Sequence, residues 1–169
     1  MLNTPSPRLE NGAADLAAAL PFDADAIVAG LEPWVRCESP TFDGAAVARM
    51  MDLVAREVAE LGAQIDIVPG RDGFGPSVRA RLPHGDFGTP GILVSGHFDT
   101  VHPVGTLAKN PFRREGDKVY GPGIMDMKSG NYLAVEALRR IMQAGAPPPC
   151  PSPCCSPRTR KSGPRPRAR

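Results

Sequence analysis

The sequence lacks long apolar runs, and no stretch approaches the roughly 18 consecutive apolar residues that a membrane span requires. Its first residues, MLNTP, also lack the basic start and the long apolar stretch of a secretion signal. These two absences predict a protein that is soluble and cytoplasmic and makes no membrane contact. Acidic residues are missing as well after Glu136, which marks a change of composition near the C-terminus.

The change of composition is sharpest from Pro147 onward. The last 23 residues hold 8 of the 20 prolines, 3 of the 4 cysteines and six of the 20 basic residues. The preceding part therefore holds 14 basic and 18 acidic residues, a formal charge of −4. This part has no charge pattern that favours nucleic acid. In a chain of 169 residues, we expect a loose leader over 1–21, one domain over 22–146 and a separate tail over 147–169.

Two helices are predicted in the first half of the domain. Asp23 or Asp25 can cap the first helix, which ends near Pro40 because the residue before a proline avoids the α region. Asp43 can cap the second helix, and Gly62 ends it. Apolar residues at helical spacing mark both helices: Ile27, Leu31, Trp34 and Val35 in the first, and Val47, Met50, Met51, Val54, Val58 and Leu61 in the second.

Three strands are predicted to follow, over 64–68, 77–82 and 91–95. The first two alternate apolar and polar residues, whereas the third contains a continuous apolar run typical of a strand buried on both faces. A later amphipathic helix is expected over 129–144. This order of elements indicates an α/β layered domain, in which ligands lie beyond the carboxyl ends of the strands.

His97 and Asp99 directly follow the third predicted strand, at the end where ligands are expected. An imidazole two residues from a carboxylate suits a metal ligand and its orienting group, since the carboxylate can fix the tautomer of the imidazole. The alternative is a hydrogen-bonded loop pair without metal, because a pattern of two residues has low specificity.

Asp126 lies in a glycine-rich turn just before the helix predicted over 129–144. Glycines allow backbone conformations that other residues avoid, and acids are favoured near a helix N-terminus. Asp126 is therefore either an acid that only stabilises the start of this helix, or a carboxylate that lies beside His97 at the same rim of the domain, beyond the carboxyl ends of the strands.

Taken together, residues 95–101 (SGHFDTV) and 121–130 (GPGIMDMKSG) resemble the zinc-dependent family of carboxypeptidase G, acetylornithine deacetylase, succinyl-diaminopimelate desuccinylase and aminoacylase. The intervening segments 105–112 (GTLAKNPF) and 115–120 (EGDKVY) look most like the carboxypeptidase G branch. The resemblance covers roughly residues 25–146. It implies an incomplete layered α/β catalytic domain of the zinc-exopeptidase type, without the family's dimerisation domain.

The resemblance also implies roles for individual residues. His97 is then a ligand of one zinc ion, Asp126 the carboxylate that bridges two zinc ions, and Asp99 the catalytic-site acid that holds His97. The peptide bond after Asp126 is implied to be cis. The reaction implied is hydrolysis of an amide beside a carboxylate-bearing group of a small peptide or N-acyl amino acid, with a zinc-activated water and a glutamate as general base.

The implied glutamate is missing from the sequence. In the family, an Asp-Glu-Glu segment follows the last predicted helix, with the first Glu as general base and the second as a zinc ligand. No acid follows Glu136 here, so the general base, the remaining carboxylate ligands and the distal histidine have no position in this chain. We expect a truncated chain with a partial zinc site, negligible activity and an uncovered strand edge, and a homodimer only for the intact enzyme.

Three interpretations of the tail remain open. Its clustered cysteines suggest a metal knuckle, although no His lies nearby, and its basic residues suggest an arm that contacts nucleic acid in a non-catalytic binding protein. The third interpretation is an out-of-frame, disordered product. If each codon is read as the last base of one residue's codon plus the first two of the next, residues 158–163 are compatible with Asp-Glu-Glu-Val-Gly, given G at the free positions and AGG for Arg160.

Four other residues carry weaker expectations. His102 matches no ligand position but can lie on the rim or near the substrate, and His84 is expected in a solvated turn. Cys37 is expected to pack at a helix end, and Lys128 to stabilise the turn that holds Asp126.

Overall fold

The computed structural model describes residues 22–82 and 92–143. The predicted leader, the turn with His84 and the tail with its cysteines therefore lie outside the described residues. The elements, in chain order, are α2 (Ala24–Arg36), α3 (Gly44–Ala59), β1 (Gln64–Val68), β2 (Ser77–Arg81), α4 (Thr106–Lys109), β3 (Arg113–Glu115), β4 (Lys118–Tyr120), an irregular turn (Ile124–Lys128) and α5 (Ser129–Gln143).

Both predicted N-terminal helices form with the expected caps. The Asp23 carboxylate accepts hydrogen bonds from the backbone N–H groups of Asp25 and Ala26 at the start of α2. At the start of α3, the Asp43 carboxylate accepts one from the N–H of Ala46. These bonds satisfy N–H groups that the first turn of a helix leaves free.

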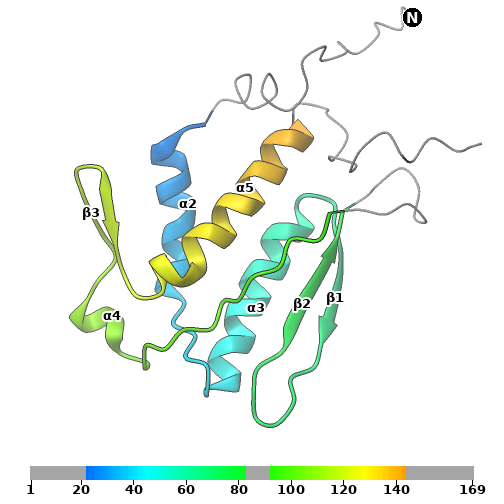
Figure 1. The fold of residues 1–169 in the computed structure, drawn as a ribbon, viewed down its shortest axis with the longest axis horizontal. Helices are drawn as coiled ribbons and strands as arrows, with labels where there is room; N and C mark the ends of the chain where they lie inside the picture. Colours follow the sequence, from blue (N-terminus) through cyan, green and yellow to red (C-terminus); the bar gives the residue numbers. More distant parts are fainter. Residues whose placement is uncertain (1–21, 83–91, 144–169) are drawn as a thin grey trace, which may run out of the picture.

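The first two predicted strands form one antiparallel hairpin. In its register, Gln64 of β1 lies opposite Arg81 of β2, and Ile67 lies opposite Val78. The hairpin packs against one side of α3, while α2 and α5 lie on the other side (Figure 1). A smaller hairpin of β3 and β4 stands apart, beside α2. None of the helices in the described ranges is long and apolar enough to span a bilayer.

The prediction of a buried strand over 91–95 is wrong for the residues described. Residues 92–99 form no strand, and the side chains of Ile92, Leu93 and Val94 are 59%, 89% and 62% exposed. A strand buried on both faces needs hydrogen-bonded neighbours and cover on each side. Within ranges 22–82 and 92–143, β2 pairs only with β1, so the apolar run stays extended and exposed.

Trp34 occupies the centre of the core. Its side chain is fully buried, and its ring meets those of Phe98 and Tyr132 edge-on, at centroid distances of 5.1 and 5.0 Å. The indole N–H donates to the Glu57 carboxylate over 2.6 Å. Because a buried indole N–H needs an acceptor, this bond fixes the orientation of the ring between α2, α3 and α5.

Arg139 of α5 links the Glu57 carboxylate, on α3, to Glu136 of α5. Its guanidinium donates to Glu57 over 2.9 Å and to Glu136 over 2.5 Å, and Arg140 binds the other oxygen of Glu136 over 2.6 Å. The Glu136 side chain is only 5% exposed. Although burial opposes the charge, these acidic partners raise the pKa of Arg139 above its ordinary value.

We expect Arg139→Met to destabilise the protein by about 2–3 kcal/mol, because Glu57 and Glu136 would each lose a buried cationic partner. Urea unfolding followed by Trp34 fluorescence measures the change. Arg36→Met is the matched control, since Arg36 pairs with Glu32 at an exposed site where such a pair contributes less than about 1 kcal/mol. Equal losses in the two variants would contradict the prediction.

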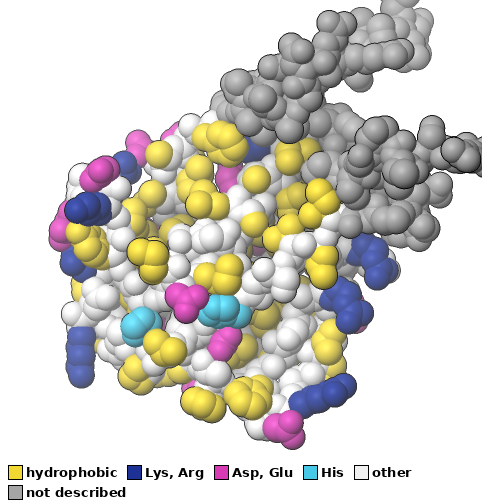
Figure 2. Space-filling view, viewed as in Figure 1, with side chains coloured by type: hydrophobic (Ala, Val, Ile, Leu, Met, Phe, Trp, Pro, Cys, Tyr) yellow, Lys and Arg dark blue, Asp and Glu magenta, His cyan; other side chains and the backbone are white. Residues whose placement is uncertain are grey.

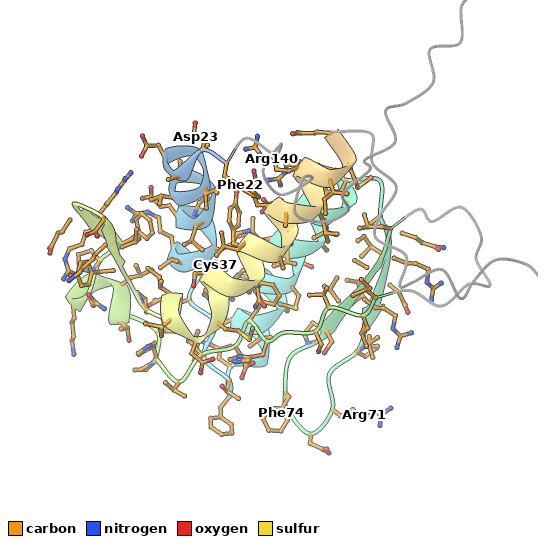
Figure 3. All side chains as sticks on the ribbon, turned by 45° about the horizontal axis from the view of Figure 1, so that its top comes forward. Phe22, Asp23, Cys37, Arg71, Phe74 and Arg140 are labelled. Atoms are coloured by element: carbon orange, nitrogen blue, oxygen red, sulfur yellow. The ribbon has the colours of Figure 1, made fainter. Side chains whose placement is uncertain are left out.

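The Lys128 side chain anchors the irregular turn to the end of α2. It is 1% exposed, and its ammonium donates to the carbonyls of Trp34 (2.9 Å) and Cys37 (2.7 Å). Cys37 caps the end of α2 and packs against the core, beside the first turn of α5 (Figure 3). Both residues thus take the structural roles expected from the sequence.

We expect Lys128→Ala to lower the free energy of unfolding by about 2–4 kcal/mol, because two carbonyl groups at the end of α2 lose their donor. Thermal denaturation followed by circular dichroism measures the loss. Lys109→Ala, at an exposed position in α4, should change stability by less than about 0.5 kcal/mol. A Lys128→Ala variant as stable as Lys109→Ala would show that the anchor is dispensable.

Candidate metal site

Two turns that are distant in sequence form one rim of the molecule. The first follows the exposed segment 92–96 and carries His97 and Asp99, and the second is the irregular turn with Asp126. Asn131, in the first turn of α5, joins them by donating to the carbonyl of His97 over 2.6 Å. Figure 2 shows histidine and acidic side chains grouped on one face of the molecule, among hydrophobic ones.

The imidazole of His97 contacts both predicted acidic residues. Its Nε2 atom lies 2.9 Å from Oδ1 of Asp126. Its Nδ1 atom lies 3.0 Å from the backbone carbonyl oxygen of Asp99 and 3.5 Å from Oδ1 of the Asp99 carboxylate. The Asp99 carbonyl is thus the nearer acceptor for an Nδ1–H group, and with that tautomer Nε2 is free to bind a metal.

Asp99 is itself held by a neighbour that the sequence did not indicate. The Thr41 hydroxyl donates to Oδ2 of the Asp99 carboxylate over 2.6 Å. Thr41 lies 58 residues from Asp99 in the chain, so no motif spacing could reveal this contact. Asn131 was missed for the same reason, although its place in the first turn after the glycine-rich segment is a weak signal.

These contacts change the pKa of His97. Partial burial disfavours the imidazolium, but the Asp99 carbonyl and the Asp126 carboxylate outweigh that effect and raise the pKa of His97. The Asp126 side chain is 79% exposed. Its carboxylate is therefore accessible from solvent as well as from His97.

The distance between His97 and Asp126 fits a shared zinc ion. Two ligands of a tetrahedral zinc ion, each about 2.0–2.1 Å from the metal, lie about 3.3 Å apart. The observed 2.9 Å requires only a small side-chain shift. A set of three or more His, Cys, Asp or Glu side chains placed to hold an ion does not occur in the part of the chain that the structure describes. The site is therefore a pair of donors rather than a full shell.

A depression of about 190 Å³ lies at this pair. His102, on its wall, is half-buried, which agrees with the rim position considered for it. Met125 also lies on the wall and is 93% exposed. The depression thus combines imidazole and carboxylate groups with an apolar edge.

The turn that carries Asp126 has an unusual backbone. The peptide bond between Asp126 and Met127 is cis, as the family resemblance implies. The preceding Gly123 adopts a left-handed conformation (φ 72°), and a Cβ atom there would lie 2.5 Å from the Thr100 side chain. Burial lowers the pKa of Lys128, which closes the turn, to about 8, although Cys37 and Glu38 partly oppose this shift.

Glu38 fixes a third loop near the rim. Its carboxylate accepts hydrogen bonds from the backbone N–H groups of Gly105 (2.8 Å) and Leu107 (2.9 Å). Burial raises the pKa of Glu38, but these bonds outweigh it and leave the pKa below the ordinary value. With both oxygens engaged, Glu38 supports the loop.

Comparison with known proteins agrees with this geometry. Residues 93–152 match the family described as Peptidase family M20/M25/M40. Carboxypeptidase G2 from Pseudomonas sp. (strain RS-16) is 34% identical over 126 residues, which are 71% of this chain and 29% of the relative. Succinyl-diaminopimelate desuccinylase from Gluconobacter oxydans (strain 621H) is 36% identical over 120 residues, which are 66% of this chain and 29% of the relative.

The fold is shared with a solved structure. The crystal structure of human carnosine dipeptidase 1 matches 84% of this chain with a TM-score of 0.65 and 22% identity, and the match covers 33% of that chain. This chain thus spans about a third or less of the length of its relatives. The resemblance predicted from the two motifs is confirmed: residues 93–152 match peptidase family M20/M25/M40, and the chain is similar to proteins named as a carboxypeptidase and a desuccinylase.

Proposed function

We propose that this chain carries part of the metal site of a zinc-dependent hydrolase that cleaves an amide bond beside a carboxylate-bearing amino acid. The observation that carries the proposal is the 2.9 Å approach of His97 Nε2 to Asp126 Oδ1, between residues 29 positions apart. The names of the relatives, a carboxypeptidase, a desuccinylase and a dipeptidase, support a small peptide or N-acyl amino acid as the substrate of the intact enzyme.

Each residue of the rim has a distinct task in this proposal. His97 and Asp126 would hold zinc, which supplies a bound water of lowered pKa and polarises the scissile carbonyl. Asp99 keeps His97 in the Nδ1–H tautomer through its backbone carbonyl, and Thr41 holds Asp99 in place. The exposed Asp126 carboxylate has a second oxygen available, so it suits a role as bridge between two ions.

The general base remains unassigned in this chain. Among the described acids near the rim, Asp99 is engaged by Thr41 and Glu38 by two backbone N–H groups. No acid follows Glu136 in the sequence. A metal-bound water would therefore have no carboxylate to take its proton, and we propose that the chain as written has negligible activity.

We expect the full chain to bind zinc weakly, because two protein donors are fewer than the three that catalytic zinc sites usually provide. Equilibrium dialysis followed by metal analysis measures the retained zinc. His97→Ala and Asp126→Ala should each abolish the residual binding, whereas Asp117→Ala, in the turn between β3 and β4, should leave it unchanged. Tight stoichiometric binding, or binding unaffected in His97→Ala, would overturn the assignment of these ligands.

We expect no zinc-dependent hydrolysis of N-acyl amino acids or dipeptides with a C-terminal carboxylate by the full chain. The physical reason is the missing proton acceptor, whose loss costs about 100-fold or more in rate by itself. Release of the free amine, measured by mass spectrometry, is compared with zinc in buffer. Turnover that disappears in His97→Ala would contradict the expected inactivity while supporting the site itself.

A further inference from the structure

The side-chain amide of Asn131 links the two turns of the candidate metal site directly. Its Nδ2 atom donates to the backbone carbonyl oxygen of His97 over 2.6 Å. Because a carbonyl oxygen can only accept, the amide atom that faces it must be the nitrogen. Asn131 is only 9% exposed, which keeps water away from this bond.

Asn131 belongs to the same backbone unit as Asp126. It lies in the first turn of α5, which begins directly after the irregular turn that carries Asp126. The Ser129 hydroxyl donates to the Ile124 carbonyl over 2.7 Å and so ties the start of the helix to that turn. The amide of Asn131 therefore reaches His97 from the element that positions Asp126.

Two hydrogen bonds join these turns directly. Within the described ranges, residues 92–102 and residues 121–131 are connected by the bond from Asn131 and by the contact of His97 Nε2 with Asp126 Oδ1. A metal ion shared by His97 and Asp126 would replace the second bond, because both atoms would then bind the ion. The bond from Asn131 is the one that can persist with the ion in place.

Gly96, directly before His97, packs against the same amide. A Cβ atom at this position would lie 2.1 Å from Oδ1 and 3.0 Å from Cγ of Asn131. Gly96 does not have a positive φ angle, so its backbone conformation does not require glycine. The neighbouring amide does, since an alanine would have to push Asn131 away and break its bond to His97.

We propose that Asn131 is a positioning residue of the metal site. Its amide holds the backbone of His97 at the distance from the Asp126 turn at which imidazole and carboxylate can share one ion. Gly96 provides the space that this amide needs. The inference rests on the proposed function for the identity of the ion, whereas the amide contact itself requires no metal.

Zinc binding to the full chain, measured by equilibrium dialysis at a series of zinc concentrations, tests the effect on the site. Asn131→Leu keeps the size and branching of the side chain but removes the donor. We expect this variant to bind zinc about 10-fold or more weakly, as when other groups that orient metal ligands are lost. Equal zinc affinity in Asn131→Leu and in the unmodified chain would overturn the proposal.

Arg139→Met separates a positioning role from a purely structural one. Arg139 lies on the same helix and forms ion pairs with Glu57 and Glu136, outside the depression at the metal pair. Its replacement should lower stability but leave the zinc affinity of the folded protein unchanged. If Asn131→Leu behaves in the same way, Asn131 has only a structural role and the proposal is wrong.

Nuclear magnetic resonance of the zinc-free chain tests the positioning without metal. In Asn131→Leu, we expect the carbonyl carbon resonance of His97 to shift, because the carbonyl loses its donor. The ring nitrogen resonances of His97 should also shift, because the contact with Asp126 loosens. Asp117→Ala, in the turn between β3 and β4, should leave them unchanged. Resonances of His97 that are unaffected in Asn131→Leu would contradict the proposal.

Melting temperatures test the pairing of Gly96 with Asn131. Gly96→Ala should lower the melting temperature by about 5 °C, because the added Cβ atom overlaps the amide. In an Asn131→Ala background the same change should cost clearly less, whereas in Asn131→Leu it should cost as much as in the unmodified chain. Additive losses in the Gly96→Ala/Asn131→Ala pair would overturn the role given to Gly96.

Gly130→Ala is the matched control for the glycine. A Cβ atom at Gly130 would lie 3.9 Å from the Met127 side chain, which is an ordinary contact, and alanine favours a helix. The melting temperature should therefore stay the same or rise. Circular dichroism shows whether each variant folds. If Gly96→Ala does not fold, Gly96→Ala/Asn131→Ala should, and failure of this double variant to fold would also overturn the pairing.

The results distinguish this inference from the proposed function. If the unmodified chain binds no zinc, the proposed function fails, and the resonances of His97 and the melting temperatures still decide the role of Asn131. If zinc binds equally well to Asn131→Leu, the proposed ligands stand and the positioning role is wrong.

Discussion

The short segment after α2, residues 37–41, holds both turns of the candidate site. The Cys37 carbonyl accepts from the Lys128 ammonium, which fixes the turn with Asp126. The Ser39 hydroxyl donates to the Phe98 carbonyl over 2.6 Å, and the Ser39 carbonyl accepts from Thr100 over 2.8 Å, which fixes the turn with His97. Ser39 is fully buried, like Trp34 at the centre of the core. The two turns are therefore attached to a rigid part of the molecule. The 2.9 Å approach of His97 to Asp126 depends on this shared support.

The sequence predicts those elements whose causes are local. Asp23 and Asp43 are caps, and caps together with apolar periodicity give helix positions to within a few residues. The positions of β1 and β2 follow from the alternation of apolar and polar residues, whereas their antiparallel pairing is seen only in the structure. The run Ile92–Val94 has an equally clear pattern, but whether it becomes a buried strand depends on neighbours elsewhere in the chain. Its exposure shows that burial is a tertiary property that a local pattern cannot supply.

The candidate site also contains residues that local sequence patterns reveal and residues that only the fold reveals. His97 and Asp126 could be named from the short motifs SGHFDTV and GPGIMDMKSG, whose glycines favour turns. Their supports Thr41 and Asn131 could not, since a hydroxyl 58 residues from Asp99 leaves no mark in local spacing. Lys128 lies between these cases: its place on the turn suggested a structural role, but only the fold shows that its partners are the carbonyls at the end of α2.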